Sequence, residues 1–317
     1  MAKINFPSLL FILSIQGLGA QTAVSPPSNS QDYSPPPGAT LGVLTLNLHT
    51  CQEKDPRKKL DRVADFIALY HLDVVCFQEC AQHEEGVLGA TPMAPFQGET
   101  PLAVDNEEYP GNSAWLVQKR LKEVHGLDYF FVWTWAHTGF GVYQEGSAVL
   151  ARHKITSRGE ALVSTEEEKS SPSRRDILWA DMEISGFGPL RMVSTHLGWG
   201  GDQITQIRNL ESALGKQNPI PTLVAGDFNM EPSFPGYKVL KEEFKFRDDF
   251  IASPDRGRQA STMDSRRIDY LWSLPGFPLA PLKAWTVFRP QQTGALAPVS
   301  DHSGLVVWYG NSSNISP

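Results

Sequence analysis

The sequence predicts a layered α/β domain, and two observations favour this class. Apolar runs typical of strands alternate with amphipathic helical patterns, giving nine or more strands with helices between them. The chain has 317 residues, of which 41% are hydrophobic, and no convincing domain boundary interrupts its middle. We therefore expect one large domain over residues 39–310.

The first elements predict a strand, a helix and a second strand. Residues 41–48 and 73–79 are apolar runs typical of buried strands. Between them, Asp55 is a candidate helix cap, Pro56 suits the first helical position, and four apolar residues share one face: Leu60, Val63, Ala64 and Ile67. A strand–helix–strand unit of this kind favours parallel strands whose ends lie side by side.

The middle of the chain continues the alternation after an irregular insert. Residues 86–111 contain Gly and Pro and no periodic pattern, and loops of this length are usually functional or disordered. Asn112 then caps a helix with Val117, Leu121 and Val124 on one face. Strands are expected at residues 129–135, 145–152, 176–184 and 190–197.

The last third predicts two further helices among four strands. Residues 202–215 form an amphipathic pattern that ends at Gly215, with Ile204, Ile207, Leu210 and Leu214 on one face. A shorter helix is expected near residues 235–244. The strands are expected at residues 221–227, 267–272, 284–288 and 302–309.

The terminal segments read as processing and linker sequences. Residues 1–20 combine Lys3, a short apolar core and small residues before a cleavage point, which predicts a signal peptide and a secreted protein. A signal anchor is the alternative, but the apolar run is shorter than the roughly 20 residues that span a bilayer. Residues 21–38 are a Pro/Ser-rich leader, and the tail 311–317 carries glycosylation sequons at Asn311 and Asn314.

The charge balance bears on the partners. The net charge is −7, and removing residues 1–20 takes away one lysine and no acid, giving −8. An acidic surface argues mildly against electrostatic capture of nucleic acid. It leaves room for a nuclease that holds phosphate through a metal and a local basic groove.

The three cysteines leave one predicted pair. Cys76 and Cys80 lie in one extended run, too far apart to bridge. Cys51 and Cys80 follow strand-like runs that we expect to be neighbours, so we predict that they pair and that Cys76 is a buried thiol.

Polar residues stand beside six of the apolar runs. Asn47, Gln78–Glu79, Thr195–His196, Asp227 with Asn229, Asp269, and Ser300–Asp301–His302 all have this position. Buried charges are costly unless they are paired or bind a metal. Carboxylate and amide oxygens suit Mg²⁺, Mn²⁺ or Ca²⁺, and the sequence has no CxxC pair or HExxH run for zinc.

The motifs around these residues, in this order, resemble the endonuclease/exonuclease/phosphatase superfamily, which has the deoxyribonuclease-I-like fold. The resemblance runs from about Leu41 to Tyr309 and rests on "LTLNLHT", "CFQE", "YQEGSAVLAR", "VSTHLGW", "GDFN", "RIDYLW" and "SDHSG". It implies a four-layer α/β sandwich of two packed, mainly antiparallel or mixed β-sheets flanked by helices. The motif sequences are most similar to those of the branch that includes maltose 6'-phosphate phosphatase.

The resemblance also implies roles for the strand-end residues. Asn47 and Glu79 would hold a divalent metal, Mg²⁺ or else Mn²⁺ or Ca²⁺, with Asp301 nearby. Asp227 and Asn229 would orient or activate water. His302 would stabilise the transition state or act as base, with its ring oriented by Asp269. His196 would contact phosphate or assist the leaving group. Each of these side chains alone could instead be a turn or strand-end residue.

Other residues have weaker assignments. His137 is either a satisfied core histidine or a substrate contact specific to this branch. Arg152 and Arg267 are either phosphate contacts or surface charges, and Trp199 is a candidate for the mouth of the site. Gly146 is expected to permit a close backbone approach. Arg174–Arg175 lie in a run that reads most simply as a solvated loop, and contact of this pair with a polyanion is the alternative.

The leading function is a secreted, metal-dependent phosphodiesterase that resembles nucleases. A phosphomonoesterase acting on sugar or nucleotide phosphates is the first alternative, and would have a small closed pocket. A sphingomyelinase-like lipid hydrolase would need an exposed aromatic hairpin, which the sequence does not clearly show. A binding protein that keeps the fold without the chemistry is the non-enzyme alternative. We expect a monomer with no membrane span and no protein partner.

Overall fold

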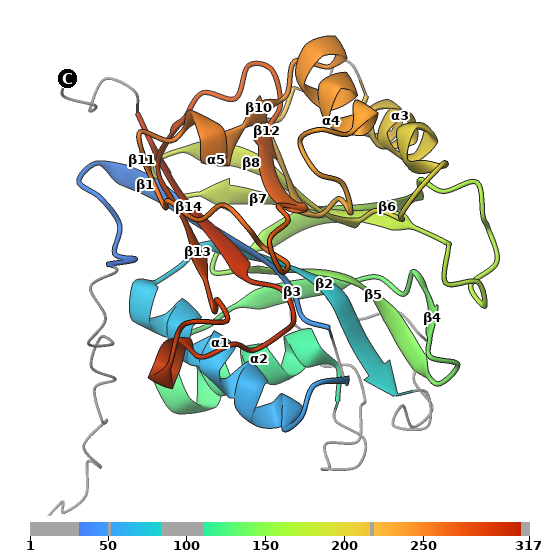
Figure 1. The fold of residues 1–317 in the computed structure, drawn as a ribbon. Coiled ribbons are helices and arrows are strands. Elements are labelled where there is room, and N and C mark those ends of the chain that lie inside the picture. Colours follow the sequence, from blue (N-terminus) through green and yellow to red (C-terminus); the bar gives the residue numbers. More distant parts are fainter. Residues whose placement is uncertain (1–31, 50–51, 84–110, 216–218, 312–317) are drawn as a thin grey trace, which may run out of the picture.

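Two β-sheets pack face to face, and helices cover the outer face of each, as Figure 1 shows. The computed structural model describes residues 32–49, 52–83, 111–215 and 219–311. The predicted four-layer α/β sandwich is confirmed.

One sheet has eight strands in the order β11–β13–β14–β1–β2–β5–β3, with β4 paired to β5. Its strands are β1 (Ala39–Asn47), β2 (Val74–His83), β3 (Phe130–Trp133), β4 (His137–Gly139), β5 (Tyr143–Ala151), β11 (Asp255–Arg256), β13 (Ala280–Val287) and β14 (Gly304–Gly310). As predicted, β1 and β2 are parallel neighbours, and Asn47 lies opposite Gln78.

The other sheet has six strands in the order β10–β12–β9–β8–β7–β6. They are β6 (Ile155–Leu162), β7 (Asp176–Ile184), β8 (Gly188–His196), β9 (Thr222–Asp227), β10 (Arg247–Asp248) and β12 (Asp269–Ser273). The expected β7–β8 hairpin forms. Strand β6 was not expected, because most of its residues are partly or fully exposed at the sheet edge and it lacks an apolar run.

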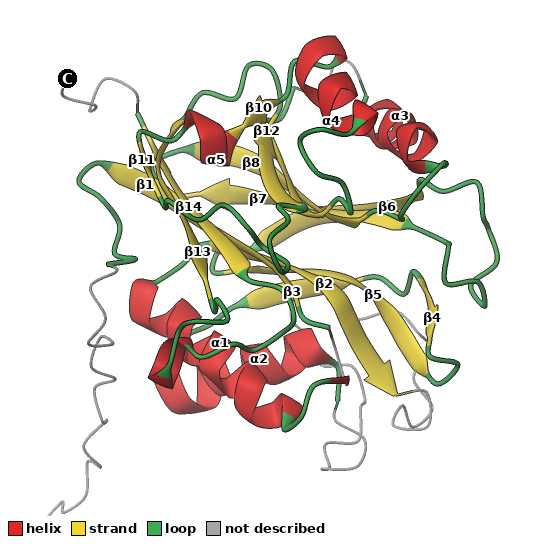
Figure 2. Cartoon of the chain, in the orientation of Figure 1, coloured by secondary structure: helices red, strands yellow, loops and turns green. Residues whose placement is uncertain are grey.

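The helices are α1 (Pro56–Tyr70), α2 (Ser113–His125), α3 (Gln203–Leu214), α4 (Pro235–Lys238), a π-helical turn (Val239–Glu243), α5 (Asp249–Ala252) and a 3₁₀ turn (Gly294–Leu296). The longer helices α1, α2 and α3, together with α4, lie on the outer faces, and the short α5 contacts both sheets (Figure 2). Asn112 caps α2 as predicted, accepting bonds from two backbone N–H groups. The predicted side-chain cap by Asp55 is wrong, because that residue adopts a left-handed backbone with φ 54°. Val124 and Ile204, expected on apolar faces, are exposed.

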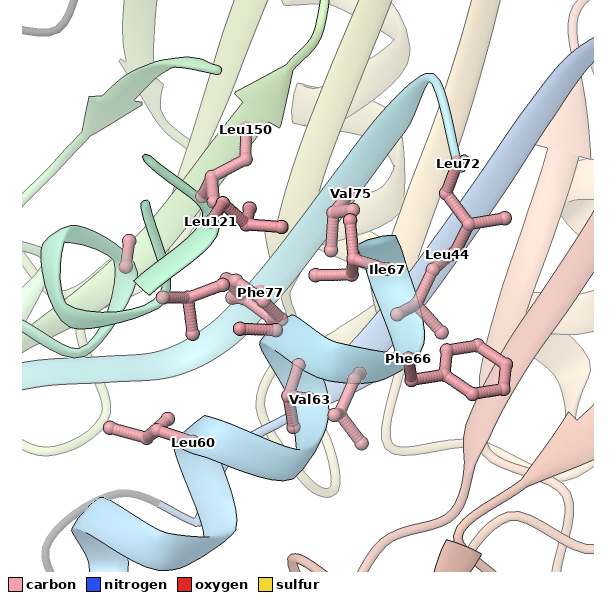
Figure 3. Close-up of a cluster of buried hydrophobic side chains, with 14 of the residues drawn as sticks. Leu44, Leu60, Val63, Phe66, Ile67, Leu72, Val75, Phe77, Leu121 and Leu150 are labelled. Carbon is pink, nitrogen blue, oxygen red and sulfur yellow. The ribbon is translucent and has the colours of Figure 1, made fainter. Parts of the chain in front are cut away.

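Three apolar clusters fill the three spaces between the four layers. One lies between the two sheets and includes Val43, Cys76 and Leu223. A second joins α1 and α2 to the eight-stranded sheet, and Figure 3 shows Leu60, Val63 and Ile67 of α1 beside the strand that carries Val75 and Phe77. The third lies under α3 and α4. Each strand thus contributes alternate residues to two different spaces.

The leader prediction needs correction for residues 32–38. Tyr33 is buried among Phe66, Tyr70 and Phe288, and its hydroxyl donates to the Thr286 carbonyl. Burial of this large aromatic side chain holds the segment against the domain, although its Pro-rich composition is typical of a linker. Residues 1–31 lie outside the described residues, so the signal peptide stays a prediction.

Several other predictions fall wholly or partly outside the described residues. They are the insert at 86–111, apart from Gly111, the sequon at Asn314, and Cys51 as the partner of Cys80. Cys76 is a buried thiol, as expected, and its burial raises its pKa. Within the described part of the chain, no helix is long and apolar enough to cross a membrane.

Candidate active site

The site forms where the apolar rows between the two sheets end. Side chains alternate along a strand, so Asn47 continues the row of Val43, and Asp227 continues the row of Leu223 and Ala225. The same spacing places three other polar residues at the ends of inward rows: Glu145, His196 and Asp269. Elements far apart in the sequence therefore bring polar groups to one edge of the sandwich.

Glu79 reaches this edge through a β-bulge. The register between β2 and β5 shifts between Phe77 and Cys80, and Glu79 has a φ of 46°. Regular alternation would send Glu79 to the same side as Phe77, which packs against the helices. A bulge re-aims a side chain, and left-handed backbone at a non-glycine residue is often found at functional sites. The bulge instead brings Glu79 to the lining of the site.

Gln78 supports the floor of the site by linking the two sheets. Its side chain bonds to Thr45 in β1 and donates to Ser194 Oγ in β8 at 3.1 Å. All three side chains are buried. This polar layer separates the apolar core from the charged residues above it.

A pocket of about 440 Å³ opens at this edge. Its lining includes four acidic residues, four histidines and one arginine among the described residues: His49, Glu79, His137, Glu145, Arg175, His196, Asp227, Asp301 and His302. Asn229, Met263, Pro172, Gly139, Phe140 and Trp199 complete it. The pocket is thus rich in groups that bind cations or transfer protons.

Asn47 and Asn229 hold Asp227 from two sides. Asn47 Nδ2 donates to Asp227 Oδ2 at 3.1 Å and to Glu79 Oε1 at 3.0 Å. The backbone N–H of Asn229 donates to Asp227 Oδ1 at 2.8 Å. The amide of Asn47 therefore spans two carboxylates from different sheets.

His302 and Asp269 form a buried pair. His302 Nδ1 lies 2.9 Å from Asp269 Oδ2, and its other ring nitrogen lies 3.7 Å from Asp227 Oδ2. Burial alone would lower the pKa of His302, but the charges of Asp269 and Asp227 and the bond to Asp269 raise it to about 10. His302 is therefore a cation at neutral pH, and its Nδ1 donates to Asp269.

The carboxylates of the pocket repel one another. Burial and the charge of Asp269 raise the pKa of Asp227 to about 8, and burial and Glu145 raise the pKa of Glu79. In the described structure, neither Asp227 nor Glu79 has a lysine or arginine within ion-pairing distance. Such carboxylates favour either a bound proton or a bound cation.

Two groups in this region could hold a metal ion. Asp227, Asp269 and His302 are buried together, and His49, Glu53 and Asp301 form a more exposed group at the rim. Asn47 donates to both Asp227 and Glu79, so it links Glu79 to the first group. With His302 protonated, the donors of the buried group are carboxylate oxygens, which suit hard divalent cations.

His196 is held neutral. Asn229 Nδ2 lies 3.1 Å from His196 Nε2, and the amide is the donor of this pair. Burial and the nearby cation of Arg175 lower the pKa of His196 well below its usual value. His196 therefore contributes a neutral imidazole beside Asp227, which lies 3.7 Å away.

The opposite wall carries a second histidine–carboxylate pair and the arginine. His137 Nε2 lies 3.1 Å from Glu145, and Arg175 Nη1 lies 3.4 Å from His137 Nδ1. The Nε atom of Arg175 is buried and has no hydrogen-bond partner among the described residues. An unpartnered guanidinium nitrogen in an acidic pocket is suited to an incoming phosphate oxygen.

Two exposed aromatic residues stand at the mouth. Phe140 is 66% exposed and Trp199 is 55% exposed, and both line the pocket. Phe140 also has a φ of 51° at the tip of the β4–β5 hairpin, where glycine or asparagine would be less strained. This hairpin is an exposed aromatic feature that the sequence did not reveal.

Most predicted site residues come together in or directly behind this pocket. Asp269 lies behind His302, and the other nine line the pocket or bond to residues that do: Asn47, Glu79, His137, His196, Trp199, Asp227, Asn229, Asp301 and His302. Gly146 permits a close approach as predicted, since a Cβ there would lie 1.8 Å from the Thr134 carbonyl oxygen.

Arg152 and Arg267 do not reach the pocket. Arg152 donates to Asp73 at 2.6 Å, at the end of the sheet where β2 begins. Arg267 pairs with the buried Asp248 at 2.7 Å and lies over the Tyr270 ring. Both neutralise structural acids, so we remove them from the candidate contacts.

Four lining residues that bear on the chemistry or on the mouth of the pocket received no role, or only a minor one, from the sequence. Glu145 lies within a quoted motif but was given no role, and His49 follows Asn47 by two positions. Arg175 stands directly before the buried strand β7, a signal that its charged surroundings obscured. Phe140 carried no sequence signal beyond the adjacent glycines.

Comparison with known proteins agrees with this geometry. The family model described as "Endonuclease/Exonuclease/phosphatase family" matches residues 44–302. No curated protein sequence matches the chain.

Three solved structures illustrate the fold. An endonuclease/exonuclease/phosphatase family protein from Leptotrichia buccalis C-1013-b has a TM-score of 0.71 at 24% identity, covering 85% of this chain and 99% of its own. A mannosyl-6-phosphatase from Bacteroides thetaiotaomicron VPI-5482 has a TM-score of 0.60 at 16% identity, covering 85% and 99%. The human Nocturnin catalytic domain has a TM-score of 0.58 at 17% identity, covering 86% and 94%. By fold, motif order and family match, the chain belongs to the endonuclease/exonuclease/phosphatase family of phosphoester-hydrolysing enzymes.

Proposed function

We propose that the protein is a secreted, divalent-metal-dependent phosphodiesterase that resembles nucleases. The observation that carries this proposal is the set of buried carboxylates in the pocket that have no lysine or arginine partner, placed opposite Arg175. Secretion rests on the signal-like pattern of residues 1–20.

A metal would be held by residues from both sheets. Glu79 and Asp227 would supply oxygen ligands, with Asp301 at the rim. Asn47 would join them after a flip of its amide, since its Nδ2 faces both carboxylates here. A bound divalent cation would neutralise a phosphate oxygen and stabilise the charge that develops in the transition state. It would also relieve the repulsion that raises the pKa values of Glu79 and Asp227.

The residues of the chain would divide the remaining work. The Arg175 guanidinium would bind a non-bridging phosphate oxygen, and cationic His302 would donate to the oxygens that gain charge. Asp227, fixed by Asn229, would orient the attacking water and take its proton. His196 would contact the phosphate as a neutral imidazole.

A phosphodiester suits this pocket better than a phosphomonoester. A monoester near neutral pH carries close to two negative charges, and a diester carries one. The described lining offers one arginine against four acids, so a monoanionic substrate meets less repulsion. The exposed aromatic mouth also leaves room for a leaving group beyond the phosphate.

A phosphomonoesterase is the second candidate. It is favoured by the structural likeness to a mannosyl-6-phosphatase and by the motif wording of the branch. A lipid hydrolase gains some support from the exposed hairpin that carries Phe140. These candidates differ in the group attached to the phosphate, so one assay separates them.

The test is hydrolysis by the purified mature protein with Mg²⁺ or Mn²⁺. The substrates are plasmid DNA, a panel of phosphomonoesters and phospholipid vesicles, with Glu79→Ala and His302→Ala as controls. We expect plasmid cleavage that both variants lose. Release of inorganic phosphate without DNA cleavage would favour the monoesterase, and silence on every substrate would favour a binding protein.

A further inference from the structure

A second hollow, lined mainly by cations, lies beside the active-site pocket. It has a volume of about 540 Å³ and is lined by Lys54, Asp55, Lys58, Lys59 and Arg62. We name it the α1 groove, because these residues belong to the first turns of α1 and the segment before it. Four cations and one acid line it in a chain whose net charge is −7.

A chain of side-chain contacts connects the α1 groove to the pocket. Lys59 pairs with Glu53, and Glu53 Oε1 lies 2.9 Å from His49 Nδ1. The same ring nitrogen lies 3.5 Å from Asp301 Oδ1, and both His49 and Asp301 line the pocket. Glu53 and His49 therefore link the lining of the groove to the lining of the pocket.

The cations of the groove fall into two classes. Lys59 is paired with Glu53, and Arg62 Nη2 donates to the Pro298 carbonyl at 3.1 Å, so both are anchored. Lys54 and Lys58 are exposed and have no ion pair within the described part of the chain. The anchored pair shapes the groove, and the exposed pair is available to a ligand.

The backbone adds to this positive field. The first turn of α1 contains no acidic residue, and the Asp55 side chain makes no cap bond to its N–H groups. The N-terminus of a helix carries a partial positive charge that favours anions. The helix end and the four side chains thus act in the same direction.

We propose that the α1 groove binds the phosphates that flank the reacting one in a nucleic acid strand. A strand with one phosphate in the pocket would continue past His49 and Glu53 to the groove, where its next phosphates would meet Lys54 and Lys58. This inference rests on the proposed function, since it names nucleic acid as the substrate. A phosphate-rich chain explains why cations gather here on an acidic protein.

The experiment reverses the two exposed charges. The variant Lys54→Glu/Lys58→Glu is compared with wild type and with Lys238→Glu/Lys241→Glu, which changes the net charge equally on the helices over the other sheet. Binding of a fluorescent single-stranded oligonucleotide is measured by anisotropy in EDTA over a range of salt. Hydrolysis of bis-p-nitrophenyl phosphate, which has no flanking phosphate, is measured with Mn²⁺.

We expect the groove variant to bind the oligonucleotide about tenfold more weakly or worse, and the control variant to bind like wild type. Each lost phosphate contact lowers the salt slope by about 0.7 units, so two contacts lower it by about 1.4. Hydrolysis of the small diester stays unchanged in both variants. The milder Lys54→Gln/Lys58→Gln variant should bind the oligonucleotide with intermediate affinity. All variants should have the melting temperature of wild type.

Equal weakening in the groove and control variants would overturn the proposal, because net charge alone would then explain it. Unchanged oligonucleotide binding in the groove variant would also overturn it. If wild type does not hydrolyse the small diester in any metal, the proposed function fails, while the anisotropy result still decides the groove.

Discussion

The buried acids of this protein fall into two sets that lie in different places. Away from the pocket, each of four buried acids has an arginine: Asp73 with Arg152, Asp181 with Arg191, Asp248 with Arg267, and Asp249 with Arg247. In the pocket, Glu79, Glu145, Asp227 and Asp269 face histidines, asparagines and one another.

The difference separates structural charge from functional charge. An acid paired with arginine satisfies its own charge and leaves nothing for a ligand. In the pocket, burial and neighbouring acids raise the pKa values of Glu79 and Asp227, the latter to about 8. In the other set, burial raises the pKa of Asp249 to about 6, although Arg247 counteracts the rise. We infer that a cation from solution neutralises the pocket acids, as arginine neutralises the acids of the other set.

The largest expected effect tests the pocket set. Glu79→Gln should lower kcat/KM for a phosphodiester by about 10³-fold or more, because a ligand and a transition-state interaction are lost together. The metal-free variant should melt no lower than wild type, since the repulsion with Glu145 disappears. A variant that keeps a tenth of the activity would place the metal elsewhere.

The matched change in the arginine-paired set should lower stability and leave activity almost unchanged. Asp248→Asn leaves Arg267 buried without its partner and weakens the bond from Tyr237, so we expect a loss of about 3–5 kcal/mol in the free energy of unfolding. Urea denaturation measures it, and kcat under folding conditions should remain near wild type. A large loss of kcat with little loss of stability would break the division between the two sets.

The next effect concerns the pair behind the pocket. Asp269→Asn removes the charge that raises the pKa of His302, so we expect this pKa to fall by several units and kcat to fall by about 10²-fold. NMR titration of the His302 ring reports the first change directly. A His302 pKa that stays near 10 would show that Asp227 alone maintains it.

The charge imbalance also predicts how pH and metal act together. The pKa of Asp227 is raised from 3.8 to about 8 in the fold, so its contribution to stability is full below about pH 4 and is lost as pH rises through about 8. A bound divalent cation should offset this loss of stability, because it neutralises the ionised carboxylate of Asp227. We expect Mn²⁺ to raise the melting temperature more at pH 8 than at pH 5, and equal shifts at both would argue against binding at Asp227.

The smallest effect is at the mouth. Phe140→Gly relieves the left-handed backbone at an exposed residue, so stability should rise by at most about 1 kcal/mol. If the aromatic ring contacts the leaving group, KM should rise a few-fold with kcat little changed. Steady-state kinetics and thermal melting on the same preparation check both, and a lower melting temperature would show that Phe140 serves the fold.

Much of the fold could be predicted because local pattern and global fold agree. The α1 face of Leu60, Val63 and Ile67 and the parallel neighbours β1 and β2 followed from periodicity alone. Tyr33 and strand β6 did not, because their partners are distant in sequence and their own composition resembles that of a linker or an exposed edge. The structure of such segments depends on tertiary contacts rather than on local sequence.

The site divides in the same way. Asp227, Asp269 and His196 could be found because each is a polar residue at the first or last position of a strand, where an inward row ends. Arg175 could not, because a residue before a strand has no periodic mark, and its neighbour Arg174 pairs with Asp176 instead. Arg152 showed the converse error, since a charge after an apolar run can just as well close the far end of a sheet.

The most direct test of the central claim is calorimetric titration of Mn²⁺ into metal-free protein at pH 8, repeated with Glu79→Gln and Asp181→Asn. We predict that wild type and Asp181→Asn bind Mn²⁺, because Asp181 pairs with Arg191 outside the pocket, and that Glu79→Gln loses this binding. Equal binding by all three proteins would contradict this prediction, because the pocket carboxylates would then not be the set that the cation neutralises.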